Sequence, residues 1–356
     1  MSTWQTYYRP HNFSQLHLTS VRENMQALAR SGRLPRVWLF TGPRGTGKTS
    51  TARILAAMLA TPANQPAIEN NFFQDQPAKL LPFADPDEKN SEVQKIFAGD
   101  SFSVIELDAA SHRGIDDVRQ LQEQMFMPPT IGTMAVYILD EVHMFTTEAF
   151  NALLKTLEEP PKHCFFILAT TEKHKVPATV VSRCSLLDFH QASNQELITS
   201  FQRILQAEKI SAEPAALTQI ADLAEGSFRD GVKLLQTVAN YGEISAEKVT
   251  KYLVGNQEEL LKELIKIILA KDDLAAVDFF ARLRQRETDE KVFIKNLFNF
   301  LYQQLVNNIK KDGQPVLSKN QAQFLLNHLL DVKLNAPLPY LDLELKVLEI
   351  FSKAKK

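Results

Sequence analysis

A glycine-rich segment near the N-terminus carries side chains suited to binding phosphate groups. It fits the pattern G-x-x-x-x-G-K-[ST] at every fixed position, with the residues Gly42, Pro43, Arg44, Gly45, Thr46, Gly47, Lys48 and Thr49. Glycine lets backbone N–H groups turn inward around phosphate oxygens, and a following helix adds partial positive charge. In this pattern the lysine contacts the β- and γ-phosphates and the hydroxyl contacts Mg²⁺, which assigns these roles to Lys48 and Thr49. A glycine-rich turn without a ligand is the alternative, and the complete pattern disfavours it.

An apolar run further along the chain ends in two acidic residues, Asp140 and Glu141. In proteins with a phosphate-binding loop, an acid at such a strand end coordinates Mg²⁺ directly or through water, and Asp140 occupies this position. The next carboxylate, that of Glu141, can polarise a water molecule for in-line attack on the γ-phosphate. By itself the pair is typical of a solvated strand end. Together with the loop, it predicts that the chain binds and hydrolyses ATP with Mg²⁺.

Three further positions carry polar side chains that are compatible with a nucleotide site. A buried run ends in Thr170 and Thr171, and a threonine there could orient the attacking water. Thr170 is the preferred candidate, although a hydroxyl that only caps the strand explains it equally well. On the residues alone, Arg183 is more typical of a surface residue or a salt bridge. Arg229 opens a helix and could reach a phosphate, but an ion pair with Asp230 explains it more simply.

The overall charge gives little support for a general nucleic-acid surface. The net charge is −2 and the sequence pI is about 6.5, so any DNA contact must come from a local patch. Arg113 and Arg119 follow the second predicted strand, but acidic residues lie between them. A solvated surface is therefore the simpler interpretation of these two arginines.

Short apolar runs predict the buried parallel strands that must position these side chains. Most of them show no alternation of polar and apolar residues, as expected for strands covered by helices on both faces. The runs are 37–41, 103–108, 135–139, 164–169 and 185–189. Helical patterns lie between them, for example at 49–59 and at 147–157, where Pro160 and Pro161 end the helix. Alternating strands and helices predict a wound α/β sheet.

The helical patterns continue alone after the last strand, which predicts further domains. We expect an α/β domain at 1–190, a small helical domain at 191–255 and a larger helical domain at 256–356. A segment at about 61–100 interrupts the α/β rhythm. Its many Pro, Asn, Gln and Asp residues favour a partly disordered surface insertion. A small packed subdomain is the alternative, because the segment also contains Phe72, Phe73, Leu80, Leu81 and Phe83.

Length and composition favour a soluble protein of several domains. The 356 residues exceed what one core usually contains, and the contents of 44% hydrophobic and 23% charged residues are ordinary. The two cysteines, Cys164 and Cys184, indicate a reducing, cytoplasmic environment and cannot form a four-cysteine zinc site. We expect no signal peptide and no membrane span, because the N-terminus has no apolar core and no run of about 18 apolar residues occurs.

The order and spacing of the motifs resemble the gamma/tau subunits of bacterial DNA polymerase III. The similarity runs from about Tyr8 to Arg229, and the block at 150–161 is its most specific part. The motifs are Arg9-Pro10-x-x-Phe13 and the segments 42–49, 108–111, 138–144, 150–161, 168–172, 182–184 and 226–230. After Arg229 the chain resembles the family only in being helical, without matching motifs.

This resemblance implies an AAA+ P-loop ATPase domain with a parallel five-stranded sheet, a helical lid domain and an all-α collar domain for oligomerisation. Such subunits form a five-membered spiral with further gamma/tau copies and the delta and delta-prime subunits. ATP binding lets the spiral open the sliding clamp (beta), and primer-template DNA triggers hydrolysis. The resemblance therefore implies a role in DNA replication within the DNA-directed DNA polymerase III holoenzyme.

The same resemblance implies roles for individual residues. Arg183 would be an arginine finger that acts on ATP held by a neighbouring subunit, Thr170 would be sensor 1 and Arg229 sensor 2. Three residues would lie near the adenine, namely Tyr8, Arg9 and Pro10. Arg113 and Arg119 would face DNA. We expect no polymerase active site in the chain and only weak hydrolysis by the isolated chain, since Arg183 would serve a neighbour.

Three departures from the family pattern limit these expectations. The segment at about 61–100 lacks the four cysteines of the family's zinc module, so we expect no zinc. In the family, the phenylalanine at the position of Phe13 is usually followed by Val-Val-Gly-Gln, but here it is followed by residues 14–19, which are different. The sequence therefore does not define the details of the adenine pocket. The chain stops at Lys356, as in a short gamma-like form without the tau tail. The alternatives are a non-catalytic delta-prime-like subunit, which usually lacks the loop, and another AAA+ ATPase associated with DNA.

Overall fold

The computed structural model of the chain describes residues 3–129, 131–284, 290–310, 316–332 and 338–353. The chain divides into two compact units, Met1–Ala246 and Glu247–Lys356. The domain boundaries expected near 190 and 255 remain predictions. Among the helices of the described residues, none is long and apolar enough to cross a bilayer.

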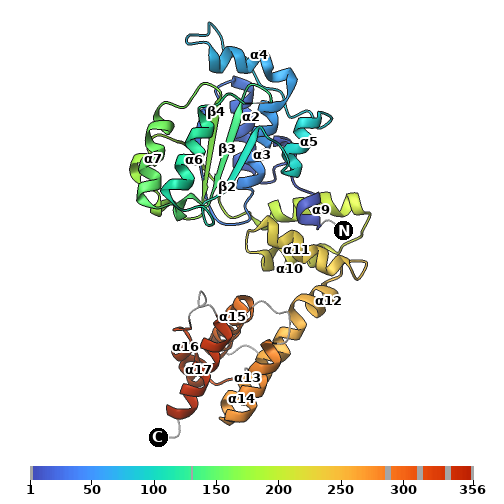
Figure 1. Cartoon of the computed structure of the whole chain (residues 1–356). Helices are drawn as coiled ribbons and strands as arrows, with labels where there is room; N and C mark the ends of the chain where they lie inside the picture. Colours follow the sequence, from blue (N-terminus) through green and yellow to red (C-terminus); the bar gives the residue numbers. More distant parts are fainter. Residues whose placement is uncertain (1–2, 130, 285–289, 311–315, 333–337, 354–356) are drawn as a thin grey trace. The chain divides into compact units, whose positions relative to one another are not determined.

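A parallel sheet of five strands forms the centre of the first unit (Figure 1). Its order is β2-β3-β4-β1-β5, so the first strand lies between the fourth and the fifth. The strands are β1 (Val37–Thr41), β2 (Val104–Asp108), β3 (Ala135–Asp140), β4 (Cys164–Thr170) and β5 (Ser185–Asp188). The structure confirms each predicted strand and the predicted parallel α/β sheet, with small shifts at the ends.

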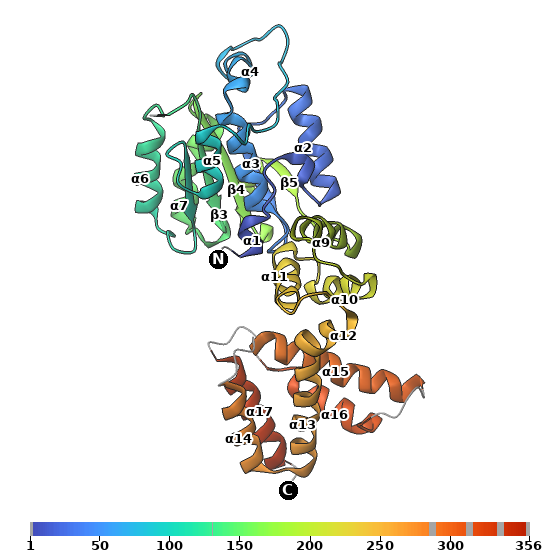
Figure 2. The same cartoon turned by 90° about the vertical axis from the view of Figure 1, so that its right-hand side faces the viewer.

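Helices cover both faces of this sheet, which explains the continuous apolar runs. On one face, Leu39 and Phe166 pack in a cluster with Leu121 and Leu153, which belong to α6 (Ile115–Met125) and α7 (Thr147–Glu158). On a strand, alternate residues point to opposite faces, so Phe40 faces the other layer. That layer contains α2 (Thr19–Ser31), α3 (Lys48–Ala60) and α5 (Ser91–Ala98), as Figures 1 and 2 show.

The segment after α3 is packed against the domain, and the structure contradicts the expected partial disorder. It forms the 3₁₀ turn Pro62–Asn64, the helix α4 (Gln65–Ile68) and the π-helical turn Glu69–Phe73. Phe72 is buried, stacks on Phe83 with 5.8 Å between ring centroids, and meets Phe165 of β4 edge-on at 6.3 Å. Phe72 and Phe83 therefore support the packed alternative, and the polar residue Asn64 is buried with them.

Replacing Phe72 with alanine tests this packing. We expect the free energy of unfolding to fall by about 3 kcal/mol, because the substitution leaves a cavity between Phe83 and Phe165. Phe73→Ala is the matched control, since the neighbouring side chain is only half-buried, and we expect a loss below about 1 kcal/mol. Denaturant unfolding measures both values. Equal losses for the two variants would contradict the packing described above.

Three helices complete the first unit beside the sheet (Figure 2). They are α9 (Asn194–Glu208), α10 (Pro214–Ala224) and α11 (Phe228–Ala239). Ser193 and Glu196 form a capping box at the start of α9, and Ser227 caps α11 by accepting a hydrogen bond from the Asp230 N–H. The short helix α1 (Trp4–Tyr7) contacts α11, because the Trp4 N–H donates to the Gln236 side chain at 3.0 Å. These contacts bring the N-terminal segment to the helices that follow the sheet.

The remaining elements of the first unit are short. They are the 3₁₀ turns Phe13–Gln15, Val142–Met144 and Lys173–Lys175, the helix α8 (Ala178–Val181) and the helix α12 (Ala246–Val249) at its boundary.

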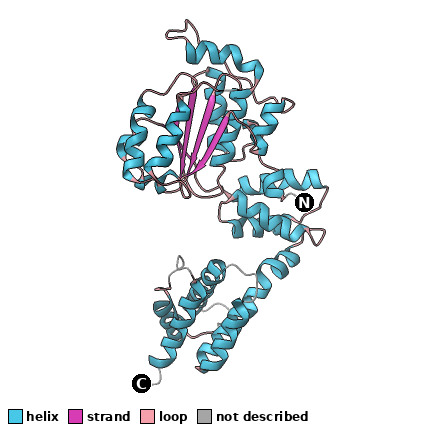
Figure 3. Cartoon of the chain, in the orientation of Figure 1, coloured by secondary structure: helices cyan, strands magenta, loops and turns pink. Residues whose placement is uncertain are grey.

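In the described residues of the second unit, all regular structure is helical, as Figure 3 shows. A π-helical turn, Thr250–Gly255, precedes five helices. They are α13 (Asn256–Ala270), α14 (Asp273–Arg284), α15 (Glu290–Lys310), α16 (Lys319–Leu329) and α17 (Pro339–Lys353). Their buried leucines and aromatic residues form one core, which includes Leu264, Phe279 and Leu297. The predicted all-α region at the end of the chain is thus confirmed in kind.

Candidate nucleotide-binding site

The sheet order brings the predicted site residues to one edge. Strands β3, β4 and β1 are neighbours, and the carboxyl ends of parallel strands meet at the same edge. The phosphate-binding loop follows β1, Asp140 ends β3 and Thr170 ends β4. A hydrogen bond from the Gly42 N–H to the Thr170 carbonyl joins the loop to β4 at 3.2 Å.

Glycine is required in the loop for two physical reasons. Gly42 has a φ of 143°, and a Cβ atom there would lie 1.9 Å from the Phe189 carbonyl oxygen. Gly45 has a φ of 78°, and a Cβ atom there would lie 2.1 Å from the Ser227 hydroxyl. Both positions therefore exclude a side chain by backbone conformation and by close packing.

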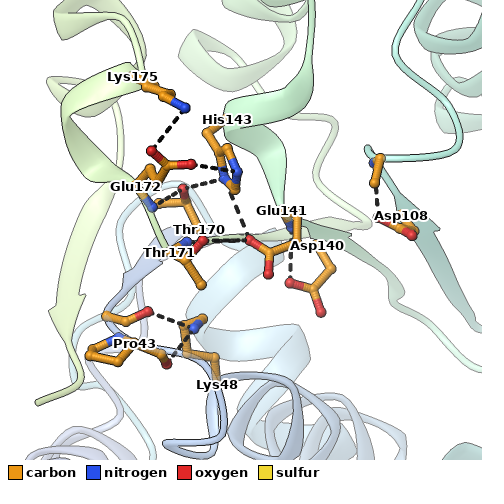
Figure 4. A network of polar contacts seen from close by, with 12 residues as sticks. Pro43, Lys48, Asp108, Asp140, Glu141, His143, Thr170, Thr171, Glu172 and Lys175 are labelled. Atoms are coloured by element: carbon orange, nitrogen blue, oxygen red, sulfur yellow. Dashed lines mark hydrogen bonds and ion pairs between the residues drawn. The ribbon is translucent and has the colours of Figure 1, made fainter. Parts of the chain in front are cut away.

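Lys48 begins α3, and its side chain turns back over the loop. The residue is 7% exposed, and its ammonium group donates hydrogen bonds to the carbonyls of Gly42 at 2.7 Å and Pro43 at 2.8 Å (Figure 4). Burial lowers the pKa of this amino group, while the carboxylates of Glu141 and Asp140 act in the opposite direction. A desolvated cation at the start of a helix of 13 residues is well placed to bind an anion.

Thr49 and Asp140 place two oxygen atoms side by side that could contribute to a metal site. The Thr49 hydroxyl donates a hydrogen bond to the Asp140 carboxylate at 3.0 Å, so the two oxygen atoms lie next to each other. Among the described residues, no group of three or more His, Cys, Asp or Glu side chains could hold a metal by itself. Mg²⁺ is commonly held by one or two protein oxygens together with phosphate oxygens and water, so this pair fits a nucleotide-bound Mg²⁺.

Glu141 directly follows β3 in a left-handed backbone conformation, with a φ of 50°. One oxygen of its carboxylate, Oε2, accepts hydrogen bonds from the Thr171 N–H at 3.3 Å and the Thr171 hydroxyl at 3.0 Å. Thr170 is fully buried, and its hydroxyl contacts His143 at 3.0 Å and accepts from the Glu172 N–H. Thr171 thus contacts the proposed base directly, while Thr170 reaches it only through His143.

A cavity of about 870 Å³ opens in front of the loop. Its size is within the range of small-molecule sites. It is lined by most of the residues predicted to bind nucleotide, namely Tyr8, Arg9, Pro10, Arg44, Gly45, Thr46, Gly47, Lys48, Thr49, Asp140, Glu141 and Arg229. The structure therefore brings residues from the N-terminal segment, the sheet and α11 around one space.

The N-terminal segment adds positive charge to this cavity. Burial and the neighbouring guanidinium groups of Arg53 and Arg229 lower the pKa of Arg9. Arg53 also forms a bidentate ion pair with Glu106, at 2.7 and 2.8 Å. Burial, followed by a hydrogen bond to Glu208, raises the pKa of Tyr8 to about 12, so its hydroxyl stays protonated. On this side of the cavity Arg9 and Arg229 lie near the Arg53–Glu106 ion pair, and this local positive charge favours an anionic ligand.

The start of α11 contacts the loop directly. The Phe228 N–H donates a hydrogen bond to the Gly45 carbonyl at 3.0 Å, and Ser227 lies against the same glycine. This contact places Arg229 on the cavity wall. The phosphate-binding loop and the first turn of α11 are therefore linked by a direct backbone hydrogen bond.

Comparisons with known proteins agree with this arrangement. Two family models match, described as "DNA polymerase III, delta subunit" over residues 18–193 and "DNA polymerase III clamp loader subunit, ATPase lid domain" over residues 196–243. The DNA polymerase III subunit gamma of Buchnera aphidicola is 31% identical over 84% of this chain and 78% of its own length. The chain belongs to the DNA polymerase III gamma/tau family.

Longer members of the gamma/tau family match as well. The DNA polymerase III subunit tau of Bacillus subtilis is 34% identical over 88% of this chain and 53% of its own length. The tau subunit of Escherichia coli is 36% identical over 74% of this chain and 39% of its own length. The chain thus spans about half or less of the length of these curated relatives.

Three arginines singled out by the gamma/tau resemblance lie outside the cavity. Arg183 donates to the Glu158 carboxylate at 2.5 Å and to the Thr179 carbonyl at 2.6 Å. Arg113 is exposed and donates to the Ala110 carbonyl at 2.9 Å, and Arg119 pairs with Asp116 across one helical turn at 3.7 Å. Their roles toward a neighbour's ATP or toward DNA stay predictions.

The structure places three further residues at the candidate nucleotide site that the sequence analysis did not predict. Arg53 and His17 line the cavity, and burial lowers the pKa of His17 to about 4, which makes it neutral at pH 7. His143 contacts Glu141 and Thr170. Only His143 had a usable signal, because it stands within the segment 138–144 that also contains the two acids.

Proposed function

We propose that the chain is an ATP-binding and ATP-hydrolysing subunit of a DNA polymerase III clamp loader. The observation that carries this proposal is the convergence of Lys48 and Thr49, at the start of α3, with Asp140 and Glu141, at the end of β3. The subunit would use ATP to open a sliding clamp and load it onto primed DNA during replication. It would act in the cytoplasm, within the holoenzyme, and would have no polymerase site of its own.

The residues of the candidate site have distinct tasks in this proposal. Lys48 binds the β- and γ-phosphates in place of its loop carbonyls, and Thr49 and Asp140 hold Mg²⁺. Bound Mg²⁺ would neutralise charge that develops on the phosphate oxygens. Glu141 accepts a proton from the attacking water. Arg229 adds positive charge from α11, and Tyr8, Arg9 and Pro10 complete the cavity on the side proposed for the adenine.

The proposed partners follow from the family. They are other gamma/tau copies, the delta and delta-prime subunits, the beta clamp and primer-template DNA. In this arrangement Arg183 acts in trans on a neighbour's ATP, and Arg113 and Arg119 face DNA. The exposure of Arg113 and Arg119 and the position of Arg183 outside its own cavity are compatible with these roles.

A non-catalytic delta-prime-like subunit is the second candidate, because a delta-subunit model matches residues 18–193. Such a subunit would need neither a phosphate-binding loop nor a base beside it. The complete loop, together with the Thr49–Asp140 contact and Glu141, therefore supports the catalytic proposal more strongly. An AAA+ ATPase with another DNA-associated task remains the third candidate.

Replacing Lys48 with alanine tests the proposed ATP site. We expect the affinity for a fluorescent ATP analogue with Mg²⁺ to fall at least about tenfold, because a charge-assisted hydrogen bond contributes roughly 1.5–3 kcal/mol. Lys162→Ala is the matched control, since this exposed lysine pairs with Asp75 and does not line the cavity. Equilibrium titration measures both affinities. If the Lys48 variant binds like the wild type, the loop does not bind phosphate.

A further inference from the structure

A buried histidine connects two glutamates at the site (Figure 4). The side chain of His143 is 7% exposed. Its Nδ1 lies 3.4 Å from Oε2 of Glu141 and 3.0 Å from the Thr170 hydroxyl, and its Nε2 lies 3.3 Å from Oε1 of Glu172. The ring thus contacts the proposed base on one side and a second carboxylate on the other.

The chemistry of these contacts limits what the ring can do. Ionised carboxylates only accept hydrogen bonds, so the ring can bond to a glutamate only through a nitrogen that carries a proton, whereas the Thr170 hydroxyl beside Nδ1 can donate or accept. Glu172 is itself held in place by Lys175 at 2.8 Å, and this hydrogen bond keeps the pKa of Glu172 below its usual range. The ring is therefore fixed from the Glu172 side and can act on Glu141.

Glu141 has one oxygen held and one oxygen available. Oε2 accepts from the N–H and the hydroxyl of Thr171 and faces His143 Nδ1. Among the described residues, Oε1 of Glu141 has no hydrogen-bond partner, and in Figure 4 it points away from the histidine, toward the side where Lys48 and Pro43 lie. This arrangement suits a general base, since the bonds to Oε2 orient the carboxylate while Oε1 stays available to accept a proton.

We infer that His143 is a positioning residue that holds the Glu141 carboxylate with Oε1 directed at the attacking water. The inference rests on the proposed ATPase function and deepens it. His143 does not touch the nucleotide, because it lies behind Glu141 and does not line the cavity. Its effect is therefore on the rate of hydrolysis and not on ATP binding.

Two amide variants separate this role from simple packing. In His143→Asn, the side-chain amide lies near the position of the histidine Nδ1 and can still donate a hydrogen bond to Glu141. In His143→Gln, the longer side chain puts the amide near the position of Nε2, where it can donate to Glu172 only. We expect the kcat for ATP hydrolysis to fall about 10–100-fold in His143→Gln and His143→Ala, since misplacing a reacting group by about 1 Å has this effect. His143→Asn should stay within a few-fold of wild type, and the KM for ATP should change little in all variants.

The measurements are steady-state hydrolysis in the assembled clamp loader, thermal unfolding of each variant, and ¹⁵N spectra of the histidine rings in the nucleotide-free protein. A hydrogen bond from His143 to Glu141 requires a proton on Nδ1, so we expect the Nδ1 signal, assigned by its loss in His143→Asn, at the shift of a protonated nitrogen. Losses of kcat that follow thermal stability, with Asn and Gln equally affected, would overturn the inference, and so would an unprotonated Nδ1. If the wild type itself hydrolyses no ATP, the proposed function fails, and the ¹⁵N result still shows whether Nδ1 of His143 carries the proton that donation to Glu141 requires.

Discussion

We expect the replacement of Glu141 with glutamine to lower the rate of ATP hydrolysis by at least about 100-fold, the usual contribution of a positioned base. We expect ATP binding to persist in this variant. The amide has the size of the carboxylate and can still contact Thr171, but it cannot accept the proton of the attacking water. Lys48, Thr49 and Asp140 remain in place for the phosphates and Mg²⁺. Single-turnover hydrolysis and equilibrium binding of a fluorescent ATP analogue measure the two effects separately.

Glu123→Gln is the matched control for this prediction. Glu123 lies on the exposed face of α6 and does not line the cavity, so the same loss of charge leaves hydrolysis unchanged there. Hydrolysis by the Glu141 variant at the wild-type rate would show that another group activates the water. Loss of ATP binding in that variant would instead mean that Glu141 supports the loop and not the chemical step.

We expect the replacement of Arg183 with alanine to abolish most hydrolysis in the assembled clamp loader and to leave ATP binding intact. An arginine supplied by a neighbour stabilises charge on the transferred phosphoryl group and contributes about 10³–10⁵ in rate. Arg183 lies outside the cavity of its own chain, and its guanidinium is held by Glu158 and the Thr179 carbonyl. Stimulated hydrolysis in the reconstituted assembly, compared with ATP affinity, tests the prediction.

Mixed assemblies determine whether Arg183 acts in trans. A Lys48→Ala chain cannot hydrolyse its own ATP but still provides Arg183, while an Arg183→Ala chain binds ATP. Mixtures of the two should therefore recover part of the hydrolysis that each variant loses alone. Glu158→Gln is the control for local structure, because it removes the partner of Arg183 and keeps the arginine. No recovery in the mixture, or an equal loss in Glu158→Gln, would contradict a role in trans.

The strands and the loop could be predicted from sequence because their signals are local. A strand buried on both faces must be apolar throughout, and the loop needs glycine at fixed positions, so short segments carry the information. The cluster around Glu141 lacks such a signal. Thr171 reaches Glu141 across 30 residues of sequence, and Glu141 has a left-handed backbone conformation that its residue type does not predict.

The segment after α3 shows why composition alone misjudges a packed insertion. Its asparagines favoured disorder in the sequence analysis, yet their side-chain amides form hydrogen bonds with backbone groups of the loop. Asn64 is buried and donates to the carbonyls of Met58 at 2.8 Å and Ala84 at 2.9 Å, and Asn71 bonds the N–H and the carbonyl of Leu81. Polar side chains that satisfy backbone groups let an irregular segment pack beside phenylalanines, and only a structure reveals this pairing.

ATP hydrolysis by the chain assembled with delta and delta-prime subunits, with and without the beta clamp and primed DNA, tests the proposed function most directly. If the chain is the clamp-loader ATPase, hydrolysis rises when clamp and primed DNA are added together and falls to background when the chain carries Lys48→Ala. If clamp and DNA leave the rate unchanged, or the Lys48 variant hydrolyses ATP like the wild type, the chain is not the motor of a clamp loader.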